Sequence, residues 1–127
     1  MNVSLTNSVA WFEVGTDDPE GAQRFYGELF GWTFGAGYGA MDYRAITTPG
    51  AEGASGGILN TKGGFPNYAV FYVLVEDVAA TVAKAEQLGG KVLIPPTTDE
   101  DGLMFAHLHD SAGNHFGVFT PPPSGGS

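Results

Sequence analysis

The chain of 127 residues is long enough for one ordinary domain, or for two small repeats that share a core. Hydrophobic residues make up 43% and charged residues 15%, which favours a folded protein over a disordered one. Fourteen acidic against five basic residues give a net charge of −9, which argues against partners such as nucleic acid or an anionic membrane. The sequence has no cysteine, which excludes disulfides, thiolate nucleophiles and cysteine-bound zinc.

Residues 1–8 have neither the basic start nor the apolar stretch of a secretory signal peptide. No apolar run approaches the roughly 20 residues that span a bilayer. Together with the absence of cysteine, these features predict a cytoplasmic protein.

The first half of the sequence predicts one strand, one helix and three further short strands. Residues 8–14 alternate in polarity as a strand does, and Asp18-Pro19 and Gly31 are a typical helix start and end. Short runs at 32–34, 42–47 and 57–59, separated by glycine-rich turns, predict the other strands. We expect the helix to bury a stripe of residues at helical spacing: Ala22, Phe25, Tyr26, Leu29 and Phe30.

The second half repeats this order. A strand at 67–75 precedes Asp77, which caps a helix running to Leu88, and strands follow at 91–94, 103–109 and 115–119. A shift of 59 residues superimposes Asp18 on Asp77 and Leu29 on Leu88. The sequence therefore predicts an α+β fold of two tandem βαβββ modules at 8–60 and 67–120, with a linker at 61–66 and a flexible tail at 121–127.

Strand residues alternate between the two faces of a sheet, so the apolar set can be assigned to the helix side. In the first strand this leaves Trp11 and Glu13 on the other, inward face. In the second module it leaves an aromatic and polar inward set: Tyr68, Val70, Tyr72, His115, Gly117 and Phe119.

Three stretches of the sequence are distinctive: Trp11-Phe12-Glu13-Val14, Phe25-Tyr26-Gly27-Glu28-Leu29-Phe30-Gly31-Trp32 and Asp110-Ser111-Ala112-Gly113-Asn114-His115-Phe116. They resemble the vicinal oxygen chelate superfamily of glyoxalases, bleomycin-resistance proteins and extradiol dioxygenases. The resemblance covers nearly the whole chain. It implies curved mixed sheets with helices on one side and a cavity on the other, and a homodimer.

The resemblance also implies four metal-ligand positions, on the first and last strand of each module. In this sequence they fall on Trp11, Ile58 (give or take one residue), Val70 and Gly117. None of these side chains offers the carboxylate, carbonyl or imidazole donor that divalent ions need. We therefore expect the usual metal site to be absent and no metal cofactor to be bound.

Several side chains remain candidates for ligand contact. Trp11 offers a flat indole for stacking on an aromatic ligand. Glu13 either bonds to Arg44 or Tyr43, or contacts the ligand as an acid–base group, since burial would raise its pKa. The predicted ligand-binding set is Trp11, Glu13, Tyr43, Ile58, Tyr68, Val70, Tyr72, His107, His115, Gly117 and Phe119.

Three functions fit these features. The first is metal-independent binding of an aromatic or apolar metabolite or antibiotic. The second is a metal-independent isomerase or lyase that uses Glu13 or a histidine as its acid–base group. The third, least favoured, is a metal-dependent lyase or dioxygenase with a displaced site made of Glu13, His107, His109 and His115.

Overall fold

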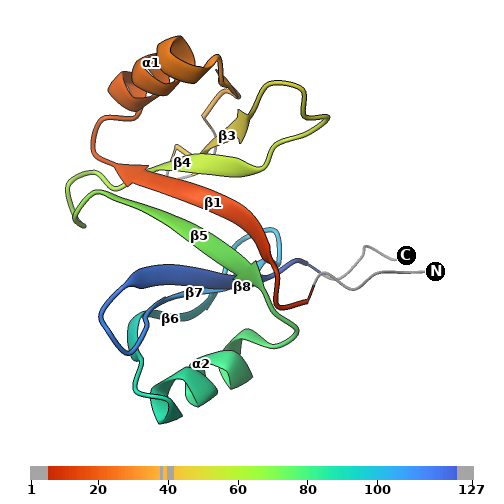
Figure 1. Cartoon of the computed structure of the whole chain (residues 1–127), viewed down its shortest axis with the longest axis vertical. Helices are drawn as coiled ribbons and strands as arrows, with labels where there is room; N and C mark the ends of the chain where they lie inside the picture. Colours follow the sequence, from red (N-terminus) through yellow and green to blue (C-terminus); the bar gives the residue numbers. More distant parts are fainter. Residues whose placement is uncertain (1–5, 38, 40–41, 123–127) are drawn as a thin grey trace. The chain divides into compact units, whose positions relative to one another are not determined.

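The computed structural model describes residues 6–37, 39 and 42–122 (Figure 1). The order of its elements is strand, helix and three strands, twice over, which confirms the predicted α+β fold of two βαβββ modules. By proximity the chain divides into two compact units. We call Trp11–Val70 the first unit and the rest of the chain the second unit. The predicted linker at 61–66 lies in the first unit, where the Gly64 amide bonds the Thr61 carbonyl. The predicted tail lies outside the described residues from 123 onward.

The first module contains β1 (Val9–Thr16), α1 (Pro19–Phe30), β2 (Thr33–Phe34), β3 (Arg44–Thr47) and β4 (Gly56–Asn60). Its strands lie in the order β2-β3-β4-β1, with β4 parallel to β1 and antiparallel to β3. This order brings the inward residues of β1 beside those of β4.

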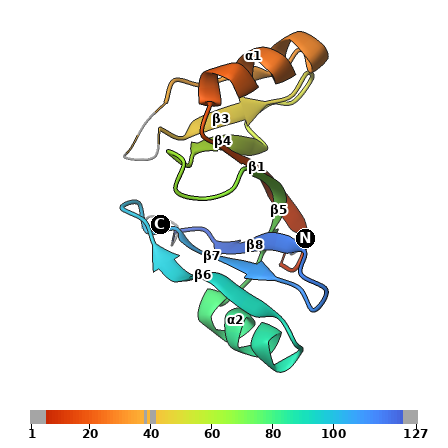
Figure 2. The same cartoon turned by 90° about the vertical axis from the view of Figure 1, so that its left-hand side faces the viewer.

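The second module contains β5 (Tyr68–Leu74), α2 (Val78–Gln87), β6 (Lys91–Thr98), β7 (Met104–His109) and β8 (His115–Thr120). Its strands lie in the order β5-β8-β7-β6, with β5 parallel to β8 and the other pairs antiparallel. Figure 2 shows each helix against one face of its own strands, α1 by β3 and β4 and α2 by β6 and β7.

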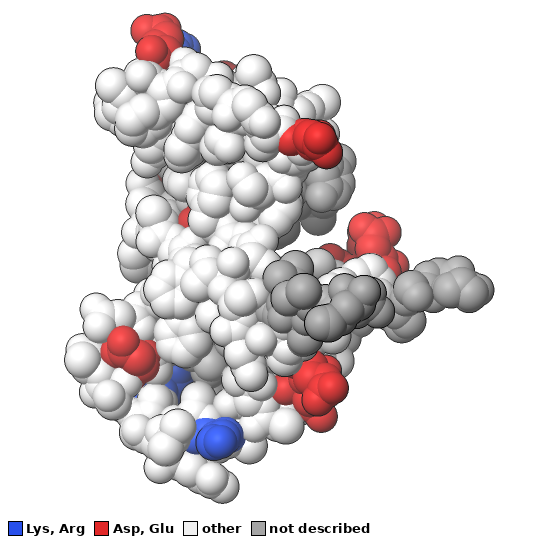
Figure 3. Space-filling model, turned by 45° about the vertical axis from the view of Figure 1, so that its right-hand side comes forward, with Lys and Arg blue, Asp and Glu red and all other residues white. Residues whose placement is uncertain are grey.

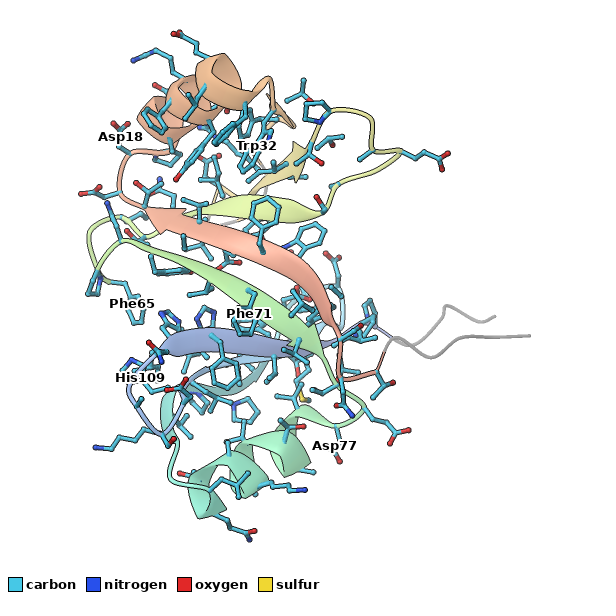
Figure 4. All side chains as sticks on the ribbon, in the orientation of Figure 1. Asp18, Trp32, Phe65, Phe71, Asp77 and His109 are labelled. Carbon is cyan, nitrogen blue, oxygen red and sulfur yellow. The ribbon has the colours of Figure 1, made fainter. Side chains whose placement is uncertain are left out.

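Both helices begin as the sequence predicts. The carboxylate of Asp18 accepts a hydrogen bond from the Gly21 amide at 3.0 Å, and Asp77 accepts one from Ala80 at 3.0 Å (Figure 4). Such caps satisfy amides that have no partner within the helix. Gly31 ends α1 in the left-handed conformation, with a φ of 76°, which glycine adopts without strain.

The apolar cores lie between each helix and its sheet. In the first unit Trp32 stacks on Tyr26, with ring centroids 5.2 Å apart, and Ile46 and Ile58 are fully buried (Figure 4). In the second unit a cluster joins α2 to its strands: Val75, Val78, Val82, Ala106, Leu108 and Val118. Burial of this kind supplies most of the stability of a small domain.

The aromatic stripe of α1 is only partly buried, contrary to prediction. Phe25, Leu29 and Phe30 are each more than half exposed. Helical spacing places these residues near one another, but β2 and β3 have only two and four residues, and Tyr26 packs against Trp32.

Strand β6 is longer than predicted, because it continues beyond Ile94 through Pro95 and Pro96 to Thr98. It is the terminal strand in the order β5-β8-β7-β6, where a proline removes no hydrogen bond that a second neighbour would need. Its pairing with β7 shifts register twice, between Val92 and Ile94 and between Ile94 and Thr97.

Neither helix of the described chain has the length and apolar character required to cross a membrane. On the face shown in Figure 3, acidic side chains form several separate groups, and basic ones are fewer.

Candidate functional site

The four strands of each module have one face turned away from their helix, which we call the helix-free face of that module. On β1, Phe12 packs against Trp32 on the helix side, so Trp11 and Glu13 lie on the helix-free face. In the second module, Val118 belongs to the core under α2, so its neighbour Gly117 lies on the helix-free face, as predicted.

The first helix-free face holds a buried carboxylate. Glu13 is 4% exposed, and its Oε1 accepts a hydrogen bond from the Tyr43 hydroxyl at 3.0 Å. Its Oε2 accepts one from the Tyr68 hydroxyl. The Tyr43 oxygen in turn accepts a bond from Nε1 of Trp11 at 2.8 Å. Four side chains from three parts of the first unit thus form one network.

Arg44, the other partner predicted for Glu13, lies elsewhere. Its guanidinium pairs with Asp42 at 2.9 Å and bonds Gln23 of α1 at 3.1 Å. Arg44 begins β3 just after Tyr43 and pairs with Ile58, so its side chain points to the helix side, opposite to that of Tyr43.

The two tyrosines of this network are held in their protonated form. Burial, and then the negative charge of Glu13, raise the pKa of Tyr43 far above its ordinary value. The same two causes, in the same order, raise the pKa of Tyr68. Both hydroxyls therefore remain hydrogen-bond donors throughout the physiological pH range.

Two glycines let these tyrosine rings lie directly on the strands. The Tyr68 ring covers Gly15, and the Tyr43 ring covers Gly57, so that a Cβ atom at either glycine would collide with the ring. The close approach fixes the orientation of both rings over the helix-free face.

The register of β4 differs by one residue from the expected ligand position. Glu13 pairs with Gly57 and Val14 with Ile58, so Ile58 points to the helix side and is fully buried. Gly57 takes the place on the helix-free face that the sequence assigned to Ile58. A one-residue difference in register reverses the face of every side chain.

The second helix-free face carries a row of three hydrogen-bonded rings. The Tyr72 oxygen lies 2.5 Å from Nε2 of His107, and Nδ1 of His107 lies 2.7 Å from Nε2 of His115. Tyr72 and His107 are buried, at 6% and 2% exposed. Phe119 meets the Tyr72 ring edge to face, with centroids 6.1 Å apart.

Burial also controls the charge of these histidines. Desolvation, and then the proximity of His115, lower the pKa of His107 to about 4. Desolvation, and then His109, lower the pKa of His115. Both imidazoles are therefore neutral at pH 7.

The residues at the metal positions implied by the resemblance do not fit a divalent ion. Trp11, Gly57 or Ile58, Val70 and Gly117 offer no carboxylate or imidazole. Within the described residues, no three His, Cys, Asp or Glu side chains are placed so as to hold an ion. In the displaced set, both ring nitrogens of His107 already make hydrogen bonds.

The structure thus brings most of the predicted site residues together in two groups. Trp11, Glu13, Tyr43 and Tyr68 form the network of the first unit. Tyr72, His107, His115, Gly117 and Phe119 lie together in the second. Val70 is buried on β5, and Ile58 belongs to neither group.

The sequence placed Gly117 on the inward face, but it did not indicate that Gly15, Gly57 and Gly117 each lie under a tyrosine ring. The sequence is rich in glycines that form turns, and only the position of Gly15, Gly57 and Gly117 within strands distinguishes them as sites of close approach.

Two grooves of about 640 Å³ each also lie in the first unit. One includes Gly15 and Tyr68, and the other runs along α1 past Arg24.

The fold and the sequence together define the class of protein. Residues 8–118 match the family model of the Glyoxalase/Bleomycin resistance protein/Dioxygenase superfamily, and the chain belongs to this family.

Curated relatives share this assignment. A glyoxylase-like domain-containing protein of Didymella fabae is 29% identical over 132 residues, covering 93% of this chain and 97% of that protein. The anthracycline biosynthesis protein DnrV of Streptomyces peucetius is 31% identical over 128 residues. That alignment covers 87% of this chain but 46% of DnrV, so this chain spans about half of the longer relative.

Solved structures show the same fold at low sequence identity. Methylmalonyl-CoA epimerase from Mycobacterium tuberculosis has a TM-score of 0.62 at 13% identity, covering 97% of this chain and 93% of the epimerase. A Mn(II)-bound glyoxalase from Novosphingobium aromaticivorans has a TM-score of 0.61 at 19% identity, covering 93% of this chain and 40% of the glyoxalase.

Proposed function

We propose that the chain binds a small aromatic or apolar molecule without the help of a metal ion. The observation that carries this proposal is the network of Trp11, Tyr43 and Tyr68 around the carboxylate of Glu13. Flat rings with a few fixed polar atoms are typical of sites for aromatic ligands.

The network is already ordered by its own contacts. The rings of Tyr68 and Tyr43 lie directly on Gly15 and Gly57, and both hydroxyls donate hydrogen bonds to Glu13. A ligand would therefore meet surfaces that lose little conformational freedom on binding, which favours affinity. The name of one relative, an anthracycline biosynthesis protein, also supports an aromatic ligand.

Metal independence is supported by the chemistry of the side chains. The positions at which the family resemblance places metal ligands carry indole, alkyl or no side chain. The proposed binding needs no ion, because the rings of Trp11, Tyr43 and Tyr68 provide the stacking surface.

Tryptophan fluorescence tests the binding site directly. The chain has two tryptophans, Trp11 in the network and Trp32 in the core. We expect planar aromatic compounds that raise the thermal midpoint to change the emission of the wild-type protein, and to leave the Trp32 emission of Trp11→Phe unchanged. A stabilising compound that changes both proteins equally binds elsewhere and contradicts the proposed site.

A second candidate function is supported by the burial of Glu13. A carboxylate that is 4% exposed on a strand is placed as an acid–base group of a metal-independent isomerase or lyase would be. For such an enzyme, Glu13→Gln abolishes turnover and retains ligand binding. If the wild-type protein shows no turnover and Glu13→Gln loses ligand binding, the first candidate function is favoured instead.

The homodimer expected from the family resemblance stays a prediction. Light scattering coupled to size exclusion measures it, and a mass of twice the chain is the expected result.

A further inference from the structure

The outer side of α1 exposes two of the apolar residues that the sequence predicts to be buried. Phe25 is 60% exposed and Leu29 is 57% exposed. Together with Gly21 they follow one another at intervals of four residues, which places them on one ridge of the helix surface. In Figures 1 and 2 no strand or helix of the first unit covers this side of α1. This apolar ridge is therefore accessible to another molecule.

The most exposed ring of the apolar ridge is held in place from beneath. Phe25 meets the Tyr26 ring edge to face, with centroids 5.3 Å apart, and Tyr26 stacks on Trp32 in the core. An aromatic side chain that is ordered before it is covered loses little conformational freedom when a partner docks. Such residues are typical anchors of protein interfaces.

A charged ridge runs beside the apolar one. Its residues, Glu20, Arg24 and Glu28, are exposed and again follow one another at intervals of four. Within the described part of the chain, the side chains of Arg24 and Glu28 make no ion pair or hydrogen bond. They carry opposite charges and lie at equal distances before and after position 26. This part of the ridge is therefore complementary to a reversed copy of itself.

We propose that a second copy of this chain docks on α1, with the two α1 helices antiparallel about a two-fold axis level with position 26. Such an interface uses the same surface of both copies, so each contact occurs twice. Arg24 of each copy lies opposite Glu28 of the other. The proposal assigns a surface to the homodimer that the family resemblance implies, and it rests on that homodimer but not on ligand binding.

The same axis lets the two apolar ridges interlock. Leu29 of one copy comes level with position 23 of the other, between Phe25 and Gly21 of that copy. Successive side chains of one ridge are about 6 Å apart along the helix, which leaves a gap for the side chain of the facing ridge. Gly21 has no side chain that would obstruct the end of this contact. One axis therefore satisfies the apolar and the charged ridge together.

The charge of the chain favours a surface of this kind for self-association. Each copy carries a net charge of −9, so two copies repel at long range and associate only through a surface that is locally apolar and complementary. The outer side of α1 has both properties, with two exposed apolar side chains and two Arg24–Glu28 pairs across the axis. A strongly basic partner would instead meet Arg24 in the middle of the charged ridge.

Charge reversal tests this surface with two variants that should pair only with each other. In Arg24→Glu the charged ridge is entirely acidic, and in Glu28→Arg both positions beside the axis are basic. We expect each variant alone to dimerise at least about tenfold more weakly than the wild-type protein in sedimentation velocity, because like charges face each other twice. We expect an equimolar mixture to form a heterodimer of about wild-type affinity, because every facing pair is again of opposite charge.

Two results would overturn the proposed surface. Either variant may dimerise as the wild-type protein does, or the mixture may associate as weakly as its components. A wild-type protein that remains monomeric up to its solubility limit overturns both this surface and the expected homodimer. Both substituted side chains are exposed, so the variants should fold, and circular dichroism checks that they do.

The apolar ridge gives a second arm with a matched control. We expect Leu29→Ser to weaken dimerisation at least about tenfold, since two leucines leave the contact. Leu88→Ser removes a leucine that is 70% exposed at the end of α2 and should leave dimerisation unchanged. Equal effects of the two substitutions, or no effect of Leu29→Ser, overturn the surface. None of these residues belongs to the Glu13 network, so the Trp11 fluorescence experiment distinguishes failure of this surface from failure of the proposed binding site.

Discussion

The Tyr68 hydroxyl donates a hydrogen bond to Oε2 of Glu13, although the two residues are 55 positions apart in the chain. Glu13 is nearly inaccessible to water, so this hydroxyl and that of Tyr43 replace part of its hydration. Leaving a buried carboxylate with fewer donors is costly, because the desolvation of its charge is then less well compensated.

Removal of one of these donors should therefore destabilise the fold. We expect Tyr68→Phe to lower the free energy of unfolding by about 1.5–3 kcal/mol, as is typical for a hydrogen bond to a charged group. Urea denaturation measures the change. The control is Tyr26→Phe, whose hydroxyl bonds none of the described residues, with an expected effect within about 0.5 kcal/mol. Equal losses in both variants would show that the bond to Glu13 contributes nothing specific.

The sequence was sufficient to predict the modules and most of their elements. Strand alternation, the caps at Asp18 and Asp77 and the repeat at 59 residues are local or periodic signals, and the structure confirms them. Tyr43 was one of two partners considered for Glu13. Tyr68 was expected on the same inward face, but its bond to Glu13 depends on a distant pairing that no local pattern encodes.

The choice between Gly57 and Ile58, which the sequence left open by one residue, has a similar cause. The 59-residue repeat aligns Ile58 with Gly117, but β4 pairs with β1 one residue differently from the way β8 pairs with β5. Register is decided by packing and by the preceding loop, and both vary between repeats. Gly57 and Gly117 are therefore the corresponding residues in the structure, and each lies under a tyrosine ring.

The close contact between Gly117 and the Tyr72 ring can be tested by adding a single methyl group at Gly117. A Cβ at Gly117 would lie 2.6 Å from the Tyr72 ring, so Gly117→Ala must displace that ring. We expect a loss of about 1–3 kcal/mol in the free energy of unfolding, the usual cost of overpacking. Gly53→Ala is the matched control, since a Cβ there meets no atom within 4 Å. A Gly117→Ala variant as stable as Gly53→Ala would contradict the close contact.

Removal of metal should leave the protein unchanged. Protein purified without chelator is expected to contain less than stoichiometric divalent metal, and EDTA is expected to leave its thermal midpoint unchanged. The reason is the lack of donor groups at Trp11, Val70 and Gly117. A stoichiometric ion, or a stabilisation by added metal that EDTA reverses, would instead support a displaced site that includes Glu13 and the histidines.

Mild acid should destabilise the protein through His107. The pKa of this imidazole is about 4 in the folded state, against 6.5 for an unperturbed histidine, so between these values the unfolded chain binds more protons. The contribution of His107 to the free energy of unfolding is therefore complete above pH 6.5, falls as the pH drops below 6.5 and levels off near pH 4. The lowered pKa of His115 acts in the same direction.

The difference between these two pKa values of His107 corresponds to a loss of about 3 kcal/mol in the free energy of unfolding at the acid end of the range. Urea denaturation at intervals from pH 7.5 to pH 4.5 measures the slope. We expect His107→Gln to flatten it, whatever its stability at pH 7.5, because only the titrating group is removed. The control His109→Gln removes a histidine outside the row of hydrogen bonds and should keep most of the slope. If His107→Gln and the wild-type protein lose stability in parallel, another group is responsible for the acid sensitivity.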